Sequence, residues 1–345
     1  MSLRLIAQTL GLSITTVSRA LAGYSDVAQL TRDRVRAEAD RIGYVPNEVA
    51  RRLQSGRSDV IGFVIPDQAR GFDDRYFLNI IEGAWSRLSG TEFDLLVMSA
   101  PEGPGEVAAY RRIVEGRRVD GVIVPRIRAD DPRIAYLNSV GFPYVAFGGR
   151  PDGDDPVVSV EIDCGQALGL AVEHLAAFGH RRIACLTAEK PYRFSQARAD
   201  AFAAAAQRFG MEPLFMPGSL DEDGGRLAMA RLIAQDDRPT AAVAVTDRMG
   251  VGALQTILES GLVPGRDMSL ITFGDNPVVQ FSNPPITAIR IPTQQMAEHA
   301  VEILIDLRDG IRRPVKELWD TELAVRASTG PAPGTDATTA LAGAA

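Results

Sequence analysis

The chain has 345 residues, 46% of them hydrophobic and 23% charged, and 44 acidic against 37 basic residues give a net charge of −7. At roughly 150 residues per domain this length predicts two or three domains, and 32 glycines with 21 prolines exclude a fibrous or largely disordered chain. Residues 1–57 carry nine arginines against five acidic residues, whereas the remainder has a net charge of −11. This basic head on an acidic body indicates a nucleic-acid contact confined to the N-terminus.

Nothing in the sequence predicts a membrane span or an export signal. No stretch reaches the roughly 18 consecutive apolar residues that a span needs. The N-terminus is interrupted by Arg4, Gln8 and Thr9, which is unlike a signal peptide. Cys164 and Cys185 are too few for a disulfide framework. We therefore expect a cytoplasmic protein with reduced thiols and no contact with a membrane.

Three short helices are predicted at the N-terminus. Apolar residues recur at helical spacing over 3–10, 14–22 and 31–42, with Ser13 and Thr31 as the N-caps of the second and third helix. Two helices joined by a turn that contains glycine form the helix-turn-helix pattern.

A linker is predicted to follow the third helix. Pro46 breaks that helix, and Asn47 can cap a short fourth helix over 48–54. The segment 47–58 is therefore the predicted connection to the rest of the chain.

Buried strands alternate with amphipathic helices from Asp59 onward, which predicts parallel sheets with helical crossovers. The strands are expected at 60–66, 94–100, 120–126, 144–148, 157–163, 182–188, 241–247 and 269–275, and the helices near 76–88, 105–115, 133–139, 165–178, 197–209, 224–235 and 249–260. A pause at 148–156 favours two open-sheet lobes over one barrel. The C-terminal segment 327–345 is small and polar, so we expect a disordered tail.

Four stretches of the chain resemble the lactose-repressor (LacI/GalR) family of bacterial transcription regulators. They are IAQTLGLSITTVSRALAG (6–23), TRDRVRAEADRIGYVPNEVARRLQSGRSDVIGFVIP (31–66), EHLAAFGHRRIACLT (173–187) and TDRMGVGALQTILESG (246–261), and the resemblance runs from about residue 3 to residue 326. It implies a homodimer in which each chain has a DNA-binding headpiece, a hinge helix and an effector domain like a periplasmic sugar-binding protein.

The expected fold is therefore an all-α helix-turn-helix headpiece with a hinge helix, followed by an α/β domain of two lobes with open parallel sheets. The expected boundaries are 1–46 for the headpiece, 47–58 for the hinge helix and linker, 59–326 for the effector-binding and dimerisation domain, and 327–345 for the tail.

The resemblance places DNA-base contacts at Ile14, Thr15 and Arg19. An isoleucine offers apolar contact to a thymine methyl group, a threonine adds a hydroxyl, and an arginine can donate two bonds to guanine. The other polar positions expected to contact phosphates or to cap helices are Ser13, Thr16, Ser18 and Asn47. The alternative is that these serines and threonines only cap and space a small helical bundle.

The predicted hinge has the composition of a minor-groove wedge. Leu53 lies beside Arg51 and Arg52, and an apolar side chain flanked by cations can pry a base step apart. In the family the paired leucines of a dimer do this at the operator centre. The alternative is the charged end of an interdomain helix, with Leu53 in a core.

Ligands of open α/β sheets bind at the carboxyl ends of the strands, where this chain places charged and aromatic residues. By resemblance the expected effector contacts are Tyr76, Phe77, Arg126, Arg150, Arg198, Leu220, Asp247 and Asp275. Alternatives remain, because Asp247 can merely cap a helix, Arg150 can pair with Asp152 or Asp154, and Tyr76 can be a surface residue.

Two departures from the family pattern bear on the ligand. Gly274 stands where many relatives have an acidic residue, so the effector contact expected there is assigned to Asp275 instead. Leu220 stands where relatives often have an aromatic residue, and without that platform a sugar is favoured over a flat purine.

Neither catalysis nor a cofactor is predicted. His174, His180 and His299 show no metal-ligand spacing, and nucleophile, phosphate-loop and dinucleotide motifs are missing from the sequence. We expect no catalytic residues, no bound metal and no cofactor.

We therefore predict a homodimeric repressor of sugar or glycoside genes that binds a pseudo-palindromic operator and responds to a sugar. The alternatives within the family are a non-sugar effector and a ligand that acts as a corepressor. The alternatives outside it are a soluble sugar-binding protein and an α/β sugar enzyme.

Overall fold

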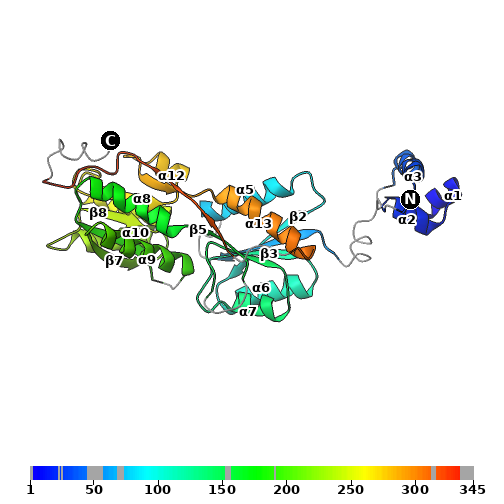
Figure 1. Cartoon of the computed structure of the whole chain (residues 1–345), viewed down its shortest axis with the longest axis horizontal. Coiled ribbons are helices and arrows are strands. Elements are labelled where there is room, and N and C mark those ends of the chain that lie inside the picture. Colours follow the sequence, from blue (N-terminus) through cyan, green and yellow to red (C-terminus); the bar gives the residue numbers. More distant parts are fainter. Residues whose placement is uncertain are drawn as a thin grey trace. The chain divides into compact units, whose positions relative to one another are not determined.

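A computed structural model of the chain, drawn in Figure 1, describes residues 3–21, 24, 26–44, 57–67, 74–151, 157–189, 192–311 and 316–334. The chain divides into two compact units, Met1–Ser58 and Asp59–Ala345. Each unit has an apolar core of its own. Within the described ranges, no helix combines the length and the apolarity that crossing a membrane requires.

The described residues of the N-terminal unit form the helices α1 (Leu3–Leu10), α2 (Ile14–Leu21) and α3 (Gln29–Arg41). Their inward faces are those predicted from the apolar spacing, since the buried core holds Ile6, Ala7, Val17, Ala20, Val35 and Ala39. Ser13 caps α2 as predicted, because the backbone amide of Thr16 donates to its hydroxyl over 2.9 Å.

The start of α3 differs from the prediction. The helix begins at Gln29 rather than after a Thr31 cap, and Ala28 at the N-cap position makes no side-chain bond. The amide of Thr31 donates instead to the carbonyl of Ala28 over 2.9 Å, so Thr31 already lies in the first turn. Gln29 also bonds Asp33 across that turn, over 2.8 Å. The predicted hinge helix cannot be compared, because residues 45–56 lie outside the described residues.

The second unit has two lobes, each built on a six-stranded sheet. The first sheet is parallel and has the order β11-β5-β4-β3-β1-β2, with β1 (Val60–Asp67), β2 (Asp94–Pro101), β3 (Gly121–Pro125), β4 (Tyr144–Phe147), β5 (Ser159–Ile162) and β11 (Lys316–Trp319). The second has the order β12-β10-β9-β8-β6-β7, with β6 (Arg182–Ala188), β7 (Glu212–Gly218), β8 (Ala241–Ala244), β9 (Ser269–Phe273), β10 (Thr287–Arg290) and an antiparallel β12 (Glu322–Ala324). The predicted fold class is thereby confirmed for the described residues.

Helices cover both faces of these sheets (Figure 1). The first lobe carries α5 (Arg75–Leu88), α6 (Pro104–Glu115), α7 (Pro132–Ser139) and α13 (Thr293–Arg308), and the second carries α8 (Cys164–Ala177), α9 (Arg193–Arg208), α10 (Glu222–Ile233), α11 (Asp247–Glu259) and the short α12 (Pro277–Gln280). β1 is buried on both sides, because Phe63 packs in one apolar cluster and Val64 in another. α5 and α13 approach closely at Gly83, where an added Cβ would lie 2.2 Å from the carbonyl oxygen of Gln294.

The division into lobes differs from the predicted pause at 148–156. β5 follows that pause, yet it pairs with β4 in the first sheet. In the described residues the chain crosses between the lobes three times, after β5, after β10 and after β11. Strand pairing decides which sheet a strand joins, and the order of strands along the chain does not reveal that pairing.

The C-terminal segment corrects the predicted disordered tail. Ser328 is fully buried, and its hydroxyl donates to the carbonyl of Leu270 over 2.6 Å and accepts from the amide of Thr287 over 2.8 Å. Hydroxyl and backbone bonds therefore hold this segment, which explains why it shows no apolar pattern. The prediction for 335–345 falls outside the described residues.

His180 belongs to the same packing arrangement. Its ring lies 2.7 Å from the hydroxyl of Thr240 and 3.1 Å from both the hydroxyl of Ser269 and the carbonyl of Gly330. Burial lowers the pKa of His180 to about 4, so the ring is neutral at pH 7. Its role in the structure is to tie the C-terminal segment to the second sheet.

Candidate functional site

The outer face of α2 carries the residues predicted to contact DNA bases. Ile14 is 44% exposed and Thr15 is also exposed, whereas Val17 and Ala20 on the same helix are buried. An exposed isoleucine at a helix start is available for apolar contact with a thymine methyl group. Ser18 is half-buried.

Ser13 and Thr16 already bond to each other. Their hydroxyl oxygens lie 2.8 Å apart, in addition to the bond between the Thr16 amide and the Ser13 hydroxyl. Their first role is therefore to cap α2, as the alternative interpretation holds, and this leaves their spare lone pairs and protons for other partners.

Arg19 is half-exposed and held beside the end of α2. It forms an ion pair with Asp26, and its guanidinium lies 5.0 Å from the centre of the Tyr24 ring. An arginine in this position must exchange Asp26 for guanine before it can contact a base. The other predicted DNA contacts, Asn47, Arg51 and Leu53, lie outside the described residues.

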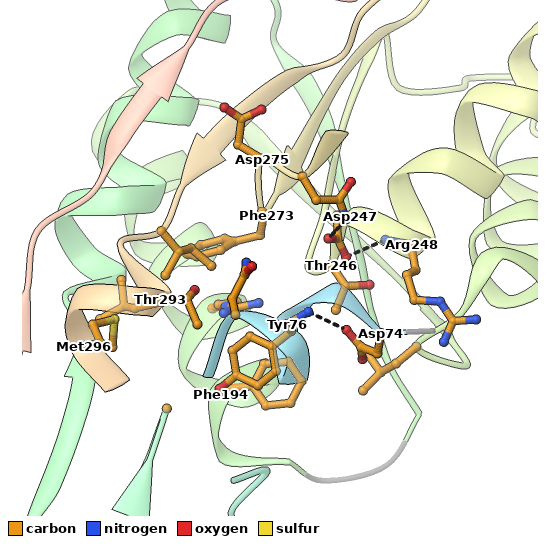
Figure 2. A pocket seen from close by; sticks show the side chains of 18 of the residues that line it. Asp74, Tyr76, Phe194, Thr246, Asp247, Arg248, Phe273, Asp275, Thr293 and Met296 are labelled. Atoms are coloured by element: carbon orange, nitrogen blue, oxygen red, sulfur yellow. Dashed lines mark hydrogen bonds between the residues drawn. The ribbon is translucent and has the colours of Figure 1, made fainter. Parts of the chain in front are cut away.

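A cleft in the second unit lies where the carboxyl ends of the two sheets face each other (Figure 2). Six of the predicted effector residues line it, namely Tyr76, Arg126, Arg198, Leu220, Asp247 and Asp275. The structure adds residues that the sequence did not single out as ligand contacts, among them Asp74, Phe147, Phe194, Phe273, Thr293 and Met296.

Arg126 and Asp74 form the charged part of the wall from the first lobe. Their side chains are 2.7 Å apart and nearly buried, and the guanidinium lies 4.8 Å from the ring centre of Phe77. Arg126 has a positive φ of 51°, which is strained for a residue with a Cβ. Asp74 also accepts the amide of Tyr76 over 3.1 Å and so caps α5.

Phe77 and Arg150 do not line this cavity. Phe77 is 1% exposed and packs behind Arg126 in the core, with Phe63, because consecutive residues of a helix point in different directions. Arg150 and Lys316 line an adjoining pocket, which shares Phe194 and Arg198 with the cleft. The carbonyl of Arg150 accepts a bond from Arg193 over 3.2 Å. The alternative pairing of Arg150 with Asp152 or Asp154 lies outside the described residues.

Arg198 supplies the wall from the second lobe. It is only 6% exposed, and its guanidinium lies 3.7 Å from the ring centre of Phe273 and 4.9 Å from that of Phe194. It donates to the carbonyl of Val245, but its Nε has no hydrogen-bond partner among the described residues. Burial lowers the pKa of Arg198 from its ordinary value.

Asp247 stands at the first position of α11. Its carboxylate accepts the amide of Arg248 over 2.8 Å and the side-chain amide of Asn276. Burial, with a smaller contribution from Asp74, raises the pKa of Asp247 to about 7. The glycine at position 274 leaves room for the Asp247 side chain, since a Cβ at position 274 would lie 3.2 Å from the Cβ of Asp247. Thr246 rather than Asp247 caps α11.

The two oxygens of the Asp275 carboxylate differ, because Oδ2 accepts from Arg290 and Arg326, whereas Oδ1 has no hydrogen-bond partner among the described residues. Its side chain is 1% exposed and lies 2.7 Å from Arg326 and 3.1 Å from Arg290. These arginines belong to β10 and to the segment after β12, so Asp275 fastens two parts of the second lobe together. These ion pairs give Asp275 a structural role, and its effector contact stays a prediction, which the lack of a hydrogen-bond partner for Oδ1 in the described part of the chain supports.

Each of the two units matches a known protein-family model. A model described as bacterial regulatory proteins, lacI family, matches residues 2–47, and one described as periplasmic binding protein-like domain matches residues 172–329. The chain is 34% identical over 307 residues to the HTH-type transcriptional regulator RafR of Escherichia coli, covering 88% of this chain and 91% of RafR.

Solved structures agree with these matches. The transcriptional regulator CelR in complex with cellobiose is 29% identical, with a TM-score of 0.71 and coverage of 95% of this chain and 99% of that one. The lac repressor dimer bound to operator and the anti-inducer ONPF has a TM-score of 0.82 with the same coverage, and at 24% identity the likeness concerns the fold.

Proposed function

This chain belongs to the LacI family of bacterial regulatory proteins, and from that premise we propose that it represses sugar-utilisation genes until a sugar occupies its cleft. As a member it is a helix-turn-helix transcriptional regulator and not an enzyme. The effector class, the residues that contact DNA and effector, and the coupling between the two units are proposed.

One observation carries the choice of effector. Arg198 is a nearly buried cation whose Nε lacks a partner among the described residues, and it is held between two aromatic rings at the cavity wall. A sugar ring has hydroxyl oxygens that accept hydrogen bonds from a guanidinium, and its hydroxyl groups donate hydrogen bonds to a carboxylate such as that of Asp247. It also has an apolar face that packs on aromatic rings. The relative CelR was solved with cellobiose, which supports a glycoside.

We assign DNA-base contacts to Ile14, Thr15 and Arg19, and minor-groove insertion to Leu53 with Arg51 beside it. The phosphate contacts proposed with them are Ser13, Thr16, Ser18 and Asn47. The proposed domain boundaries follow from these roles, with the headpiece over 1–46, the hinge over 47–58 and the effector domain from 59.

We propose a homodimer on a pseudo-palindromic operator, because two-fold symmetry in the protein matches two half-sites. Large apolar side chains on the described surface support this, notably Trp85 on α5 and Val278 and Phe281 at α12, which are 65%, 59% and 84% exposed. Since its partner is chromosomal DNA, the proposed location is the bacterial cytoplasm.

The coupling follows from the three crossings between the lobes. Effector binding favours the closed arrangement of the lobes, and the first lobe is the one that the hinge joins in sequence. A coupling free energy of about 1–3 kcal/mol is typical of such systems and acts equally in both directions.

The test is a gel-shift titration of the purified full chain on the DNA upstream of its own gene and of the neighbouring operon. We expect a shifted band at low salt that cellobiose or another neutral glycoside weakens. No shift at low salt excludes a DNA-binding regulator, and a shift that sugar strengthens identifies a corepressor. A shift that no glycoside changes rejects the sugar effector.

A further inference from the structure

The start of α9 in the second lobe contacts the first lobe directly, next to Phe194, which lines the cleft. The backbone amide of Arg193 donates to the carbonyl of Ile127 over 2.9 Å. Tyr192 and Arg128 form an isolated antiparallel β-bridge beside it. These contacts join the end of the loop before α9 to the segment that follows β3.

The side chain of Tyr192 adds a third contact between the lobes. Its hydroxyl donates to Oε1 of Glu102, just after β2, over 2.6 Å, and Tyr192 is only 3% exposed. A buried phenol usually finds a hydrogen-bond partner, and this one finds it in the opposite lobe. Burial and the neighbouring Glu102 raise the pKa of Tyr192, so the hydroxyl remains a donor at neutral pH.

The ring of Tyr192 begins a stack that ends in the cleft. It lies almost parallel to the ring of Phe194, with centres 5.8 Å apart. Phe194 in turn covers the guanidinium of Arg198, which lies on Phe273 on its other side. Phe194, Arg198 and Phe273 line the cavity, whereas Tyr192 and Glu102 do not (Figure 2 shows Phe194 and Phe273 at the cavity).

We propose that Tyr192 is a positioning residue for effector binding, whose bond to Glu102 fixes the first turn of α9 against the first lobe and so places Phe194 and Arg198. The role of an effector in this statement rests on the proposed function, but the bond between the lobes does not.

The first test uses the full chain without ligand. Tyr192→Phe keeps the stacked ring and removes only the bond, so amide hydrogen exchange in the first turn of α9 should accelerate about tenfold, as expected for one hydrogen bond to a charged group. Tyr136→Phe is the matched control, because that tyrosine is also buried and its hydroxyl has no partner among the described residues. Equal exchange in both variants overturns the positioning role.

The second test is calorimetric titration of the same variants with cellobiose and with other neutral glycosides. We expect Tyr192→Phe to bind about tenfold more weakly, with faster dissociation, and Tyr136→Phe to bind like the unmodified chain. Faster exchange with unchanged glycoside affinity overturns the proposal for effector binding. If no glycoside binds the unmodified chain, the proposed function fails, while the exchange result still decides whether Tyr192 holds α9.

Discussion

Two buried arginines in the second unit have opposite surroundings. Arg133, fully buried in the first lobe, lies 2.6 Å from both Glu106 and Asp131 and donates to the carbonyl of Arg126 over 3.0 Å. Arg198, at the cleft, donates to a backbone carbonyl, but among the described residues it has no ion pair with a carboxylate comparable to those of Arg133, and its Nε has no partner.

The electrostatic consequences are opposite as well. The carboxylates around Arg133 outweigh its burial and raise its pKa, whereas burial dominates at Arg198 and lowers its pKa. A buried charge that the fold satisfies holds the fold together, and one that the fold leaves unsatisfied is available to a ligand. The two arginines therefore contrast a cation that the fold satisfies with the one that we propose to contact the effector.

The largest expected effect is on stability at Arg133. Arg133→Met leaves the buried carboxylates of Glu106 and Asp131 without their central cation, which should lower the free energy of unfolding by about 3–5 kcal/mol. Urea denaturation of the full chain, followed by circular dichroism, measures it. A loss below about 1 kcal/mol would remove the contrast between the two arginines.

Arg198→Met is the same substitution at the second arginine of the comparison. It removes a poorly compensated buried charge, so stability should stay equal or rise, while affinity for the sugar that shifts the operator complex falls about a hundredfold. Calorimetry measures the affinity, and operator binding without sugar should remain near that of the unmodified chain. Normal sugar binding in this variant would show that the cleft assignment is wrong.

The raised pKa of Asp247 predicts that the stability of the chain depends on pH. Because its folded pKa is about 7 against an ordinary value of 3.8, the folded chain holds a proton that the unfolded chain loses between about pH 4 and pH 7. The free energy of unfolding should therefore fall as pH rises through this window, by at most about 1.4 kcal/mol per pH unit. Asp247→Asn should lack this component.

The difference between the two chains at each pH isolates that component. His180 titrates in the opposite sense, since burial lowers its pKa to about 4, but it is present in both chains and its contribution cancels. Parallel stability profiles for the two chains would contradict the burial argument at Asp247.

The smallest expected effect concerns Arg19, an exposed arginine with an exchangeable partner. Asp26→Asn releases it, and since exposed ion pairs contribute about 0.2–1 kcal/mol, operator affinity at low salt should rise a few-fold. Fluorescence anisotropy with labelled operator measures this. Asp33→Asn changes the headpiece charge equally, but at a residue that accepts from Gln29 and not from Arg19, so an equal rise there would point to net charge alone.

Much of the fold was predictable from local pattern. Runs such as 60–66 and 241–245 are apolar throughout, which only strands covered on both faces require. β7, β11 and β12 were missed because they are edge strands with half-exposed patterns, and β7 contains two prolines that only an edge tolerates well. β10 was missed as well, although it is a largely buried inner strand, because it is only four residues long. The lobe to which β5 belongs depends on pairing, which leaves no local trace.

For the candidate site, the sequence predicted which strand ends contribute to it better than which side chains line it. The sequence located the ends of β3 and β8 and so Arg126 and Asp247, but it did not tell Tyr76, which lines the cleft, from Phe77, which is buried behind Arg126. Asp74 carried a usable signal, since an aspartate directly before an apolar helix is a strong N-cap. The unsatisfied Nε of Arg198 appears only in three dimensions.

The first lobe is assembled from two separate stretches of chain, since α13 and β11 return to it after the second lobe is complete. During synthesis the headpiece therefore leaves the ribosome long before its sensor is finished, and the lobe that follows it in sequence waits for residues 293–319. A message cut short before that point would encode a DNA-contacting head without a completed sensor. Such a truncated product would bind operator DNA through its headpiece, and no effector would release it, because the effector-binding domain is incomplete.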